Sequence, residues 1–203
     1  MADHRSDPEV YWVEPRERAI IPLDQFHLSK SLRKALRQNR FRVTCDADFA
    51  GVMAECAAPR EEHAESWISH RIEASYKALH NAGYAHSIEC WRGNQLVGGL
   101  YGVAFDRVFC GESMFSRTAD ASKVALAWLV AAMRQAGYIL LDCQFMTDHL
   151  ATMGACAIPQ TRYLALLAAA RDYPSESLPE VVERFGAASS PGNSIAQSLT
   201  QTS

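Results

Sequence analysis

Two polar side chains stand at the end of the apolar segment YILLDCQF, residues 138–145. Side chains alternate along a strand, so Asp142 and Gln144 are expected on the same side. A carboxylate and an amide placed side by side can hold and orient an attacking amine. A single Asp at a strand end more commonly caps the chain or forms a salt bridge, and that interpretation stays open.

Other polar residues surround this pair in the expected order of elements. Glu112 and Ser113 end the preceding strand, and Thr147, Asp148 and His149 open the following helix. Polar residues at junctions of strands and helices are typical of active sites in α/β folds. The stretch from Phe109 to Cys156 is therefore the predicted centre of the chemistry.

Covalent and metal-dependent chemistry have little support. Residues 111–115 read GESMF, which is not the G-x-S-x-G elbow of a serine hydrolase. Asp148 and His149 adjoin, so on a helix they point about 100° apart and do not form a ready dyad. His and Cys residues show no metal-ligand spacing, and we expect no metal.

Composition indicates an ordinary globular protein. The chain has 203 residues, 48% of them hydrophobic, and a net charge of −3, so any nucleic-acid surface has to be local. Six cysteines without a Cys-x-x-Cys motif suggest reduced thiols. The longest apolar run, 124–133, is too short to cross a bilayer, and the polar start lacks a signal peptide core. We expect a cytoplasmic protein that does not contact membranes.

Turn signals and periodicity predict an α/β (α+β) fold with a mixed sheet. Residues 84–91 and 95–105 predict a hairpin around Arg92-Gly93-Asn94, and residues 108–111 extend it to an antiparallel meander. Glycines 98, 99 and 102 favour a bulge or a close backbone approach. A helix from 119 or 120 to 136, ended by Gly137, then leads to strand 138–145. This strand-helix-strand crossover requires parallel pairing.

Two long strings carry a specific resemblance. The sequences GGLYGVAFDRVFCGESMFSR (98–117) and LLDCQFMTDHLATMGAC (140–156), followed by Ile158-Pro159, closely resemble the leucyl/phenylalanyl-tRNA–protein transferases. The resemblance implies an aminoacyltransferase that moves Leu, and also Phe or Met, from aminoacyl-tRNA to the N-terminal Arg or Lys of proteins, marking them for N-degron proteolysis. It also implies a fold similar to the N-acetyltransferase (GNAT) superfamily, with no cofactor because aminoacyl-tRNA is a co-substrate.

The resemblance suggests three parts of the chain. Residues 1–10 are expected to be flexible, residues 11–174 to form the aminoacyltransferase domain, and residues 175–203 to be a Ser-rich tail. The tail is expected to be disordered apart from a short helix near 179–185. Family members typically carry a further N-terminal module, so this chain is expected to be either a natural short form or one whose start was assigned late. It is also expected to be a monomer.

A basic helix is predicted after Ser29, which can cap it. Its buried stripe is Leu28, Leu32, Ala35 and Leu36, and Lys30, Arg33, Lys34 and Arg37 form a stripe on another face. Such a charge run is usually a solvated face, but without an acid it is also a plausible phosphate track. The resemblance assigns tRNA phosphate binding to Arg33, Lys34 and Arg37.

Two tryptophans stand out in polar surroundings. Trp12 follows Tyr11, and Trp67 precedes a helix over 69–81. Trp12 could pack at the edge of the hydrophobic core, and Trp67 could pack against the first turn of the following helix as a hydrophobic staple. The resemblance implies that both bind the terminal adenosine of tRNA, although the segment after Trp12 departs from the family's pattern.

The remaining site residues are candidates for the reaction that the resemblance implies, chosen by their places on the predicted strands and the central helix. Asp142 and Gln144 orient the acceptor amine or take its proton, and Glu112 attracts its cationic side chain. An apolar pocket for the donor side chain would contain Leu100, Phe109, Met114, Leu126 and Leu129. Each of these five is equally readable as ordinary core.

Two other functions compete with this hypothesis. One is an inactive module that binds tRNA or N-degrons. The other is a CoA-dependent N-acyltransferase, which needs a glycine-rich turn before its central helix to hold the pyrophosphate. The corresponding segment, SMFSRTADASK (113–123), has no glycine and argues against CoA.

Overall fold

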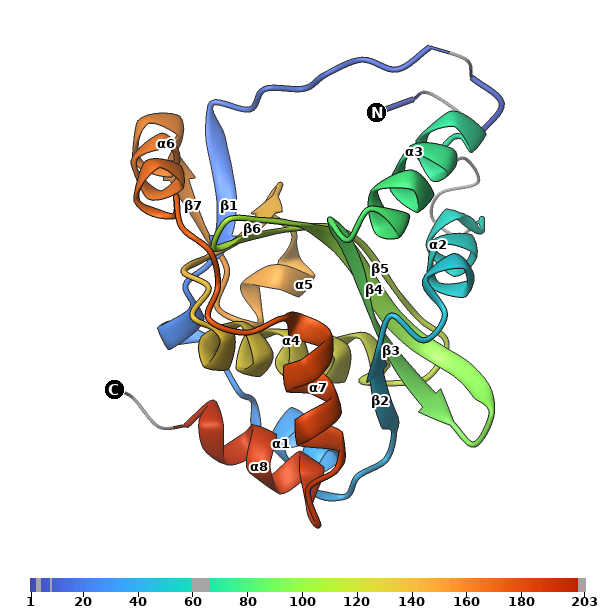
Figure 1. The fold of residues 1–203 in the computed structure, drawn as a ribbon, viewed down its shortest axis with the longest axis vertical. Helices are drawn as coiled ribbons and strands as arrows, with labels where there is room; N and C mark the ends of the chain where they lie inside the picture. Colours follow the sequence, from blue (N-terminus) through green and yellow to red (C-terminus); the bar gives the residue numbers. More distant parts are fainter. Residues whose placement is uncertain (3–4, 8, 60–65, 201–203) are drawn as a thin grey trace.

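A mixed seven-stranded sheet organises the chain. The structure is a computed structural model that describes residues 1–2, 5–7, 9–59 and 66–200. The strands run in the order β2-β3-β4-β5-β6-β1-β7 (Figure 1). Their bounds are Glu17–Ile21 for β1, Arg42–Cys45 for β2, Ala85–Arg92 for β3, Gln95–Phe105 for β4, Val108–Ser116 for β5, Leu140–Gln144 for β6 and Cys156–Pro159 for β7.

The pairing confirms the predicted mixed α/β architecture. Strands β2 to β5 form an antiparallel meander, β5 and β6 are parallel, and β1 lies antiparallel between β6 and β7. The bulge that the glycines of β4 predict is present, because the register between β4 and β5 shifts between Tyr101 and Gly102. The sequence did not indicate that β1 would join the sheet next to β6.

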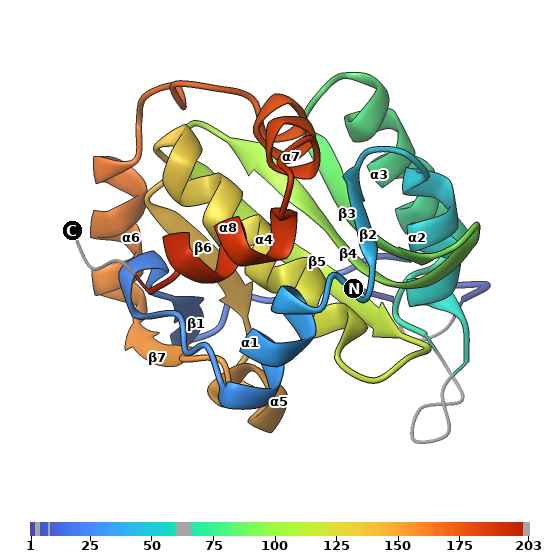
Figure 2. The same ribbon diagram turned by 90° about the horizontal axis from the view of Figure 1, so that it is seen from below.

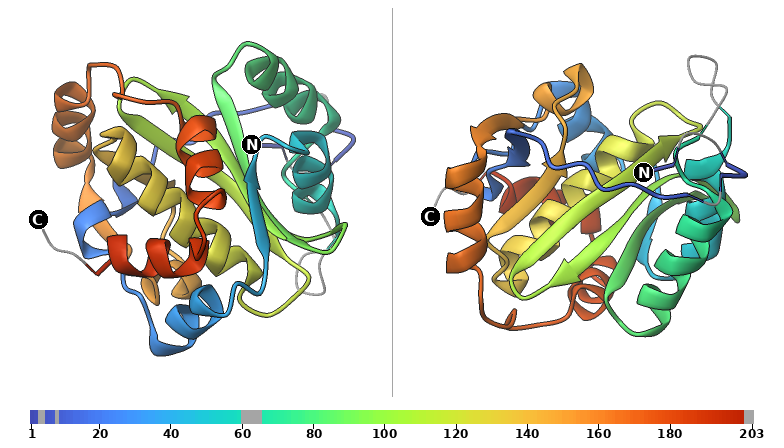
Figure 3. Two further views of the ribbon diagram at one scale, coloured as in Figure 1. Left: turned by 60° about the horizontal axis from the view of Figure 1, so that its bottom comes forward. Right: turned by 90° about the horizontal axis from the view of Figure 1, so that it is seen from above.

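Helices cover both faces of the sheet (Figures 1 and 2). Helices α2 and α3 pack on one face of the meander, while α4, α7, α8 and α1 gather on the other (Figure 3). The helix bounds are Lys30–Arg37 for α1, Phe49–Ala57 for α2, His70–Asn81 for α3, Ala121–Ala136 for α4, Asp148–Ala151 for α5, Gln160–Ala169 for α6, Leu178–Gly186 for α7 and Pro191–Ser198 for α8. A short 3-10 helix, η1, covers Leu23–Gln25.

The central helix α4 connects β5 to β6, as the crossover pattern predicts. Nearly all of its residues are buried, and it ends at Gly137, which adopts φ 80°. Close packing against β4 depends on Gly98, because a Cβ added there would lie 2.4 Å from the Cβ of Ala121. The helix therefore sits directly on the sheet.

Strands β5 and β6 separate where the site begins. Their parallel pairing runs from Val108 opposite Leu140 to Cys110 opposite Asp142 and stops there. Strand β5 nevertheless continues to Ser116, and β6 continues to Gln144. Two strand ends thus diverge and leave their side chains and backbone groups available to a ligand.

The C-terminal region contains the short helix expected near 179–185, but it corrects the expectation that the rest of the tail is disordered. Residues 178–186 and 191–198 are helical, and Leu178, Val181, Ile195 and Leu199 belong to the main hydrophobic core. The Ser198 carbonyl also accepts a hydrogen bond from Arg134 at 2.9 Å. Small polar residues dominate this segment's composition, but its few large apolar residues are spaced to reach one helix face.

The described part of residues 1–10 also makes defined contacts, in contrast to the expected flexible N-terminus. Met1 and Tyr11 exchange backbone hydrogen bonds of 2.7 and 3.0 Å, and Ala2 is buried. In Figure 1 the segment that precedes β1 extends from β1 toward α3. Within the described ranges, no helix has the length and apolar character needed to cross a membrane.

The packed tail predicts a clear stability difference between two variants of α8. Ile195→Ala removes a fully buried side chain and should lower the free energy of unfolding by roughly 2–5 kcal/mol. Gln197→Ala, on the exposed face of the same helix, should change it by less than about 0.5 kcal/mol. Urea unfolding measures both. Equal, negligible effects would show that the tail does not pack.

Candidate active site

A large cavity opens where β5 and β6 separate. Its volume is about 1130 Å³, and it is lined by residues from two of the hydrophobic clusters of the protein. Leu126 and Leu129 reach it from the α4 side, while Tyr76 and Tyr101 reach it from the side of α2 and α3. The cavity therefore extends from one face of the sheet toward the other, with the diverging strand ends at its middle.

Gln144 and Glu112 meet in this cavity, as the sequence predicts. The Gln144 Nε2 group donates to Glu112 Oε2 at 2.9 Å and approaches the Gly111 carbonyl at 3.4 Å. The backbone of Gln144 has φ 65°, a left-handed conformation that side-chain-bearing residues adopt at a cost. Such local strain is enriched at active sites and ligand-binding positions.

The environment of Glu112 disfavours its charged form. Burial is the largest cause of its raised pKa, and the negative charge of Asp142 adds to it. Hydrogen bonds from Gln144 and Tyr76 act in the opposite direction and stabilise the carboxylate. A cationic ligand beside Glu112 would remove this penalty, so the site favours a positive charge.

Asp142 occupies a different position from the one that the sequence suggests. Its side chain is fully buried and is not part of the cavity lining. Arg18 donates to it with Nε and with Nη2, the latter at 2.8 Å, and Tyr163 donates to Oδ2 at 2.8 Å. The salt-bridge alternative is thus realised, and the predicted role of Asp142 toward the acceptor amine stays a prediction.

The predicted apolar pocket is largely present. Leu100, Met114, Leu126 and Leu129 all line the cavity. Phe109 does not, because it is completely buried in the core, where its ring fills the space beside Gly102. Sequence reasoning missed further apolar lining residues, namely Leu141, Cys143 and Leu150.

Aromatic residues form the opposite part of the cavity. Trp12 lines it with 98% of its surface exposed, and Trp67 lines it from a partly buried position. Sequence reasoning missed Tyr76 because it shares an ordinary apolar helix face. It also missed Tyr101, whose buried hydroxyl has no partner among the described residues. Exposed aromatic faces beside an unpaired donor suit a planar, polar ligand.

Neither the Cys143 thiol nor the His149 imidazole in the cavity is activated for nucleophilic catalysis. Burial raises the pKa of Cys143 to about 12, so the thiol form predominates at neutral pH. Burial and the nearby Lys123 lower the pKa of His149, which favours the neutral imidazole. The functional groups offered are thus mainly hydrogen-bonding and apolar.

The basic helix lies apart from the cavity. Ser29 accepts the Leu32 N–H at 3.2 Å and caps α1 as predicted. A separate hollow of about 310 Å³ is surrounded by the cationic residues of this helix, together with Gln38: Lys30, Arg33, Lys34 and Arg37. The four cationic side chains thus border one hollow, whereas their tRNA-binding role stays a prediction.

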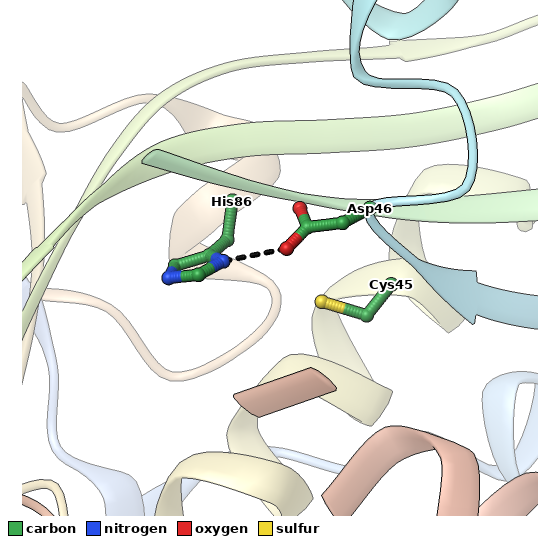
Figure 4. Close-up of side chains that lie close together, drawn as sticks. All are labelled: Cys45, Asp46 and His86. Atoms are coloured by element: carbon green, nitrogen blue, oxygen red, sulfur yellow. Dashed lines mark hydrogen bonds and ion pairs between the residues drawn. The ribbon is translucent and has the colours of Figure 1, made fainter. Parts of the chain in front are cut away.

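One group of described side chains has ligand types that suit a metal ion. The potential ligand atoms of Cys45, Asp46 and His86 lie within 4.8 Å of one another (Figure 4). Both Asp46 oxygens already accept hydrogen bonds, from His86 Nδ1 at 2.6 Å and from the Ser87 N–H at 2.8 Å. Burial and nearby carboxylates raise the pKa of the Cys45 thiol well above its usual range. These contacts join the end of β2 to β3, and the expectation of no metal stays a prediction.

An apolar pocket, aromatic side chains and an oriented amide meet where two strands of the mixed sheet separate, an arrangement that suits a group-transfer enzyme. Comparison with known proteins identifies which one. The model of the family "Leucyl/phenylalanyl-tRNA protein transferase" matches residues 20–168, and the chain belongs to this aminoacyltransferase family.

Two relatives illustrate the relationship. A leucyl/phenylalanyl-tRNA–protein transferase of Novosphingobium aromaticivorans is 55% identical over 239 aligned residues, covering 100% of this chain and 91% of the relative. One of Maricaulis maris is 49% identical over 205 residues, with the same coverage. Among solved structures, a conserved Staphylococcus epidermidis protein of unknown function covers 70% of this chain and 57% of its own, with a TM-score of 0.45 and 12% identity.

The buried Glu112 predicts a pH-dependent stability change. Because its pKa is higher in the folded state than the ordinary 4.5, the folded protein binds this proton more tightly, and stability falls as pH rises through the raised pKa. Glu112→Gln should therefore raise the Tm at pH 7, and the gain should disappear near pH 4. The exposed Glu183→Gln serves as control in the same thermal scans. A gain that is equal at both pH values would contradict this.

Proposed function

We propose that the protein transfers Leu, and also Phe or Met, from aminoacyl-tRNA to the N-terminal Arg or Lys of acceptor proteins. The contact between Gln144 and Glu112 carries this proposal, because it lies where the apolar and aromatic parts of the cavity meet. A donor side chain would fill the apolar part and the terminal adenosine the aromatic part, which places the ester between them. Family membership supports these substrates.

The orientation of the Gln144 amide suits an attacking amine. Its Nε2 group is directed to Glu112 and Gly111, so Oε1 is left to accept a hydrogen bond from the acceptor's α-amino group. The amine nitrogen attacks the ester carbonyl, a C–N bond forms, and the C–O bond to the ribose breaks. The ribose oxygen takes up the proton that the amine loses.

This reaction requires alignment more than covalent catalysis. An aminoacyl ester is already activated, and the proposed reaction consumes no cofactor. Holding two reactants in an attack geometry lowers the barrier by as much as about 7–11 kcal/mol. Glu112 contributes a negative charge beside the amine, which favours acceptors whose first side chain is cationic.

Docking of the tRNA would use two surfaces. The terminal adenosine would stack on Trp12 and Trp67, both of which line the cavity. Phosphates of the acceptor arm would lie along Arg33, Lys34 and Arg37, which border the separate basic hollow. Asp142 has no direct contact with substrate in this proposal.

Several wider properties belong to the same proposal. The meander followed by the β5–α4–β6 crossover supports an N-acetyltransferase-like (GNAT) fold. We place the protein in the cytoplasm, where aminoacyl-tRNA and N-degron proteolysis occur, and we expect it to act as a monomer.

The proposal is tested by transfer of radiolabelled leucine from leucyl-tRNA to a peptide that begins with Arg. An identical peptide beginning with Ala, and a parallel reaction with valyl-tRNA, are the controls. We expect label only on the Arg peptide and only from leucyl-tRNA. Intact tRNA binding without transfer would instead identify a binding module.

The role of Gln144 predicts a loss of turnover without a loss of folding. Gln144→Gly removes the amide and should reduce kcat about 100-fold, as misplacing a reacting group does. Relief of left-handed strain, about 1–3 kcal/mol, offsets the lost hydrogen bond to Glu112, about 1.5–3 kcal/mol. The Tm should therefore change by only a few degrees. Transfer at the normal rate would refute this role.

A further inference from the structure

The Asp142 carboxylate joins three distant segments of the chain. Arg18 comes from β1, Tyr163 from α6, and Gln144 from the end of β6. Each donates to this single buried group: Arg18 through Nε and Nη2, Tyr163 through its hydroxyl, and Gln144 through its backbone N–H at 2.8 Å. Cys110 approaches the same carboxylate with its Sγ at 3.5 Å. Asp142 thus has its hydrogen-bonding positions filled from within the protein.

The bond to Gln144 links this cluster to the cavity. Asp142 Oδ1 accepts the Gln144 N–H two residues further along, at the position where φ is 65°. A short acceptor that bonds two residues ahead stabilises a tight turn of the backbone. The left-handed conformation directs the side-chain amide toward Glu112 Oε2. The orientation of that amide therefore depends on where the Asp142 carboxylate is held.

Arg18 and Tyr163 determine that position. The Arg18 guanidinium donates hydrogen bonds to the Asp142 carboxylate and lies 4.9 Å from the centre of the Tyr163 ring. The Tyr163 hydroxyl reaches Oδ2, and burial is the first cause of the raised pKa of this tyrosine, so it stays a donor. Two directed donors and a stacked ring leave the carboxylate little freedom to rotate.

We propose that Arg18 and Tyr163 are positioning residues for acyl transfer, which orient the Gln144 amide through the buried carboxylate of Asp142. This inference rests on the proposed function and extends it to Tyr163, which lies outside the cavity lining, and to Arg18, which borders the cavity while its guanidinium binds Asp142. Neither has to contact the reacting atoms. Their effect should appear in the rate of the chemical step and not in the affinity for either substrate.

Tyr163→Phe tests the inference with a single missing hydroxyl. It keeps the ring that stacks on Arg18, whereas replacement of Arg18 leaves a buried carboxylate unpaired and could prevent folding. We expect kcat to fall about tenfold, as for loss of a hydrogen bond to a charged group, with KM unchanged for aminoacyl-tRNA and Arg peptide. Tyr138→Phe, at a buried tyrosine outside the cavity lining, is the matched control and should keep kcat.

A second background separates positioning from general weakening of the fold. If Tyr163 acts through Gln144, then Tyr163→Phe should cause no further loss in a Gln144→Gly protein. An undiminished kcat in Tyr163→Phe would overturn this inference and leave the proposed function intact. The same holds if Tyr163→Phe lowers kcat equally in the unmodified and the Gln144→Gly proteins. Absence of transfer by the unmodified protein would overturn the proposed function together with it.

Discussion

The ion pair between Arg18 and Asp142 is the interaction on which the site depends. A fully buried carboxylate is costly to desolvate unless charged and polar donors surround it, and Asp142 has both kinds. Its partner lies on β1, which pairs with β6 on one side and with β7 on the other. The pair therefore fastens the N-terminal strand and the C-terminal α6 to the strand whose end carries Gln144. Without it, the gap between β5 and β6 would lack a fixed edge.

Several features of the site are unfavourable for folding on their own. Gln144 adopts a left-handed backbone, Glu112 is a desolvated acid, and the Tyr101 hydroxyl has no described partner. The surrounding structure compensates through the closely packed α4 and the helices α7 and α8, which complete the main core. This division is expected of an enzyme, because active sites concentrate local strain and desolvated polar groups that the rest of the fold has to stabilise.

Sequence reasoning succeeded where the signal was local or lay in a long specific string. The meander, the crossover and the capped basic helix follow from turns, periodicity and Ser29, and the strings around Glu112 and Gln144 led to the family. It failed where contacts join distant positions. Nothing near Arg18 indicates that it pairs with Asp142, 124 residues away. Phe109 alternates like a pocket residue, yet it fills the space left by Gly102. The tail was misjudged because its composition hides the few apolar residues that pack.

The central claim is that Asp142 acts by holding Gln144 and not by touching the substrates. The most direct measurement is the single-turnover rate of leucine transfer by Asp142→Asn with saturating leucyl-tRNA and Arg peptide, alongside the dissociation constant for the tRNA. The account predicts a rate at least about tenfold slower, because the amide weakens the contacts with Arg18 and Tyr163, with tRNA affinity unchanged. A normal rate, or a slow rate explained entirely by weaker tRNA binding, would contradict it.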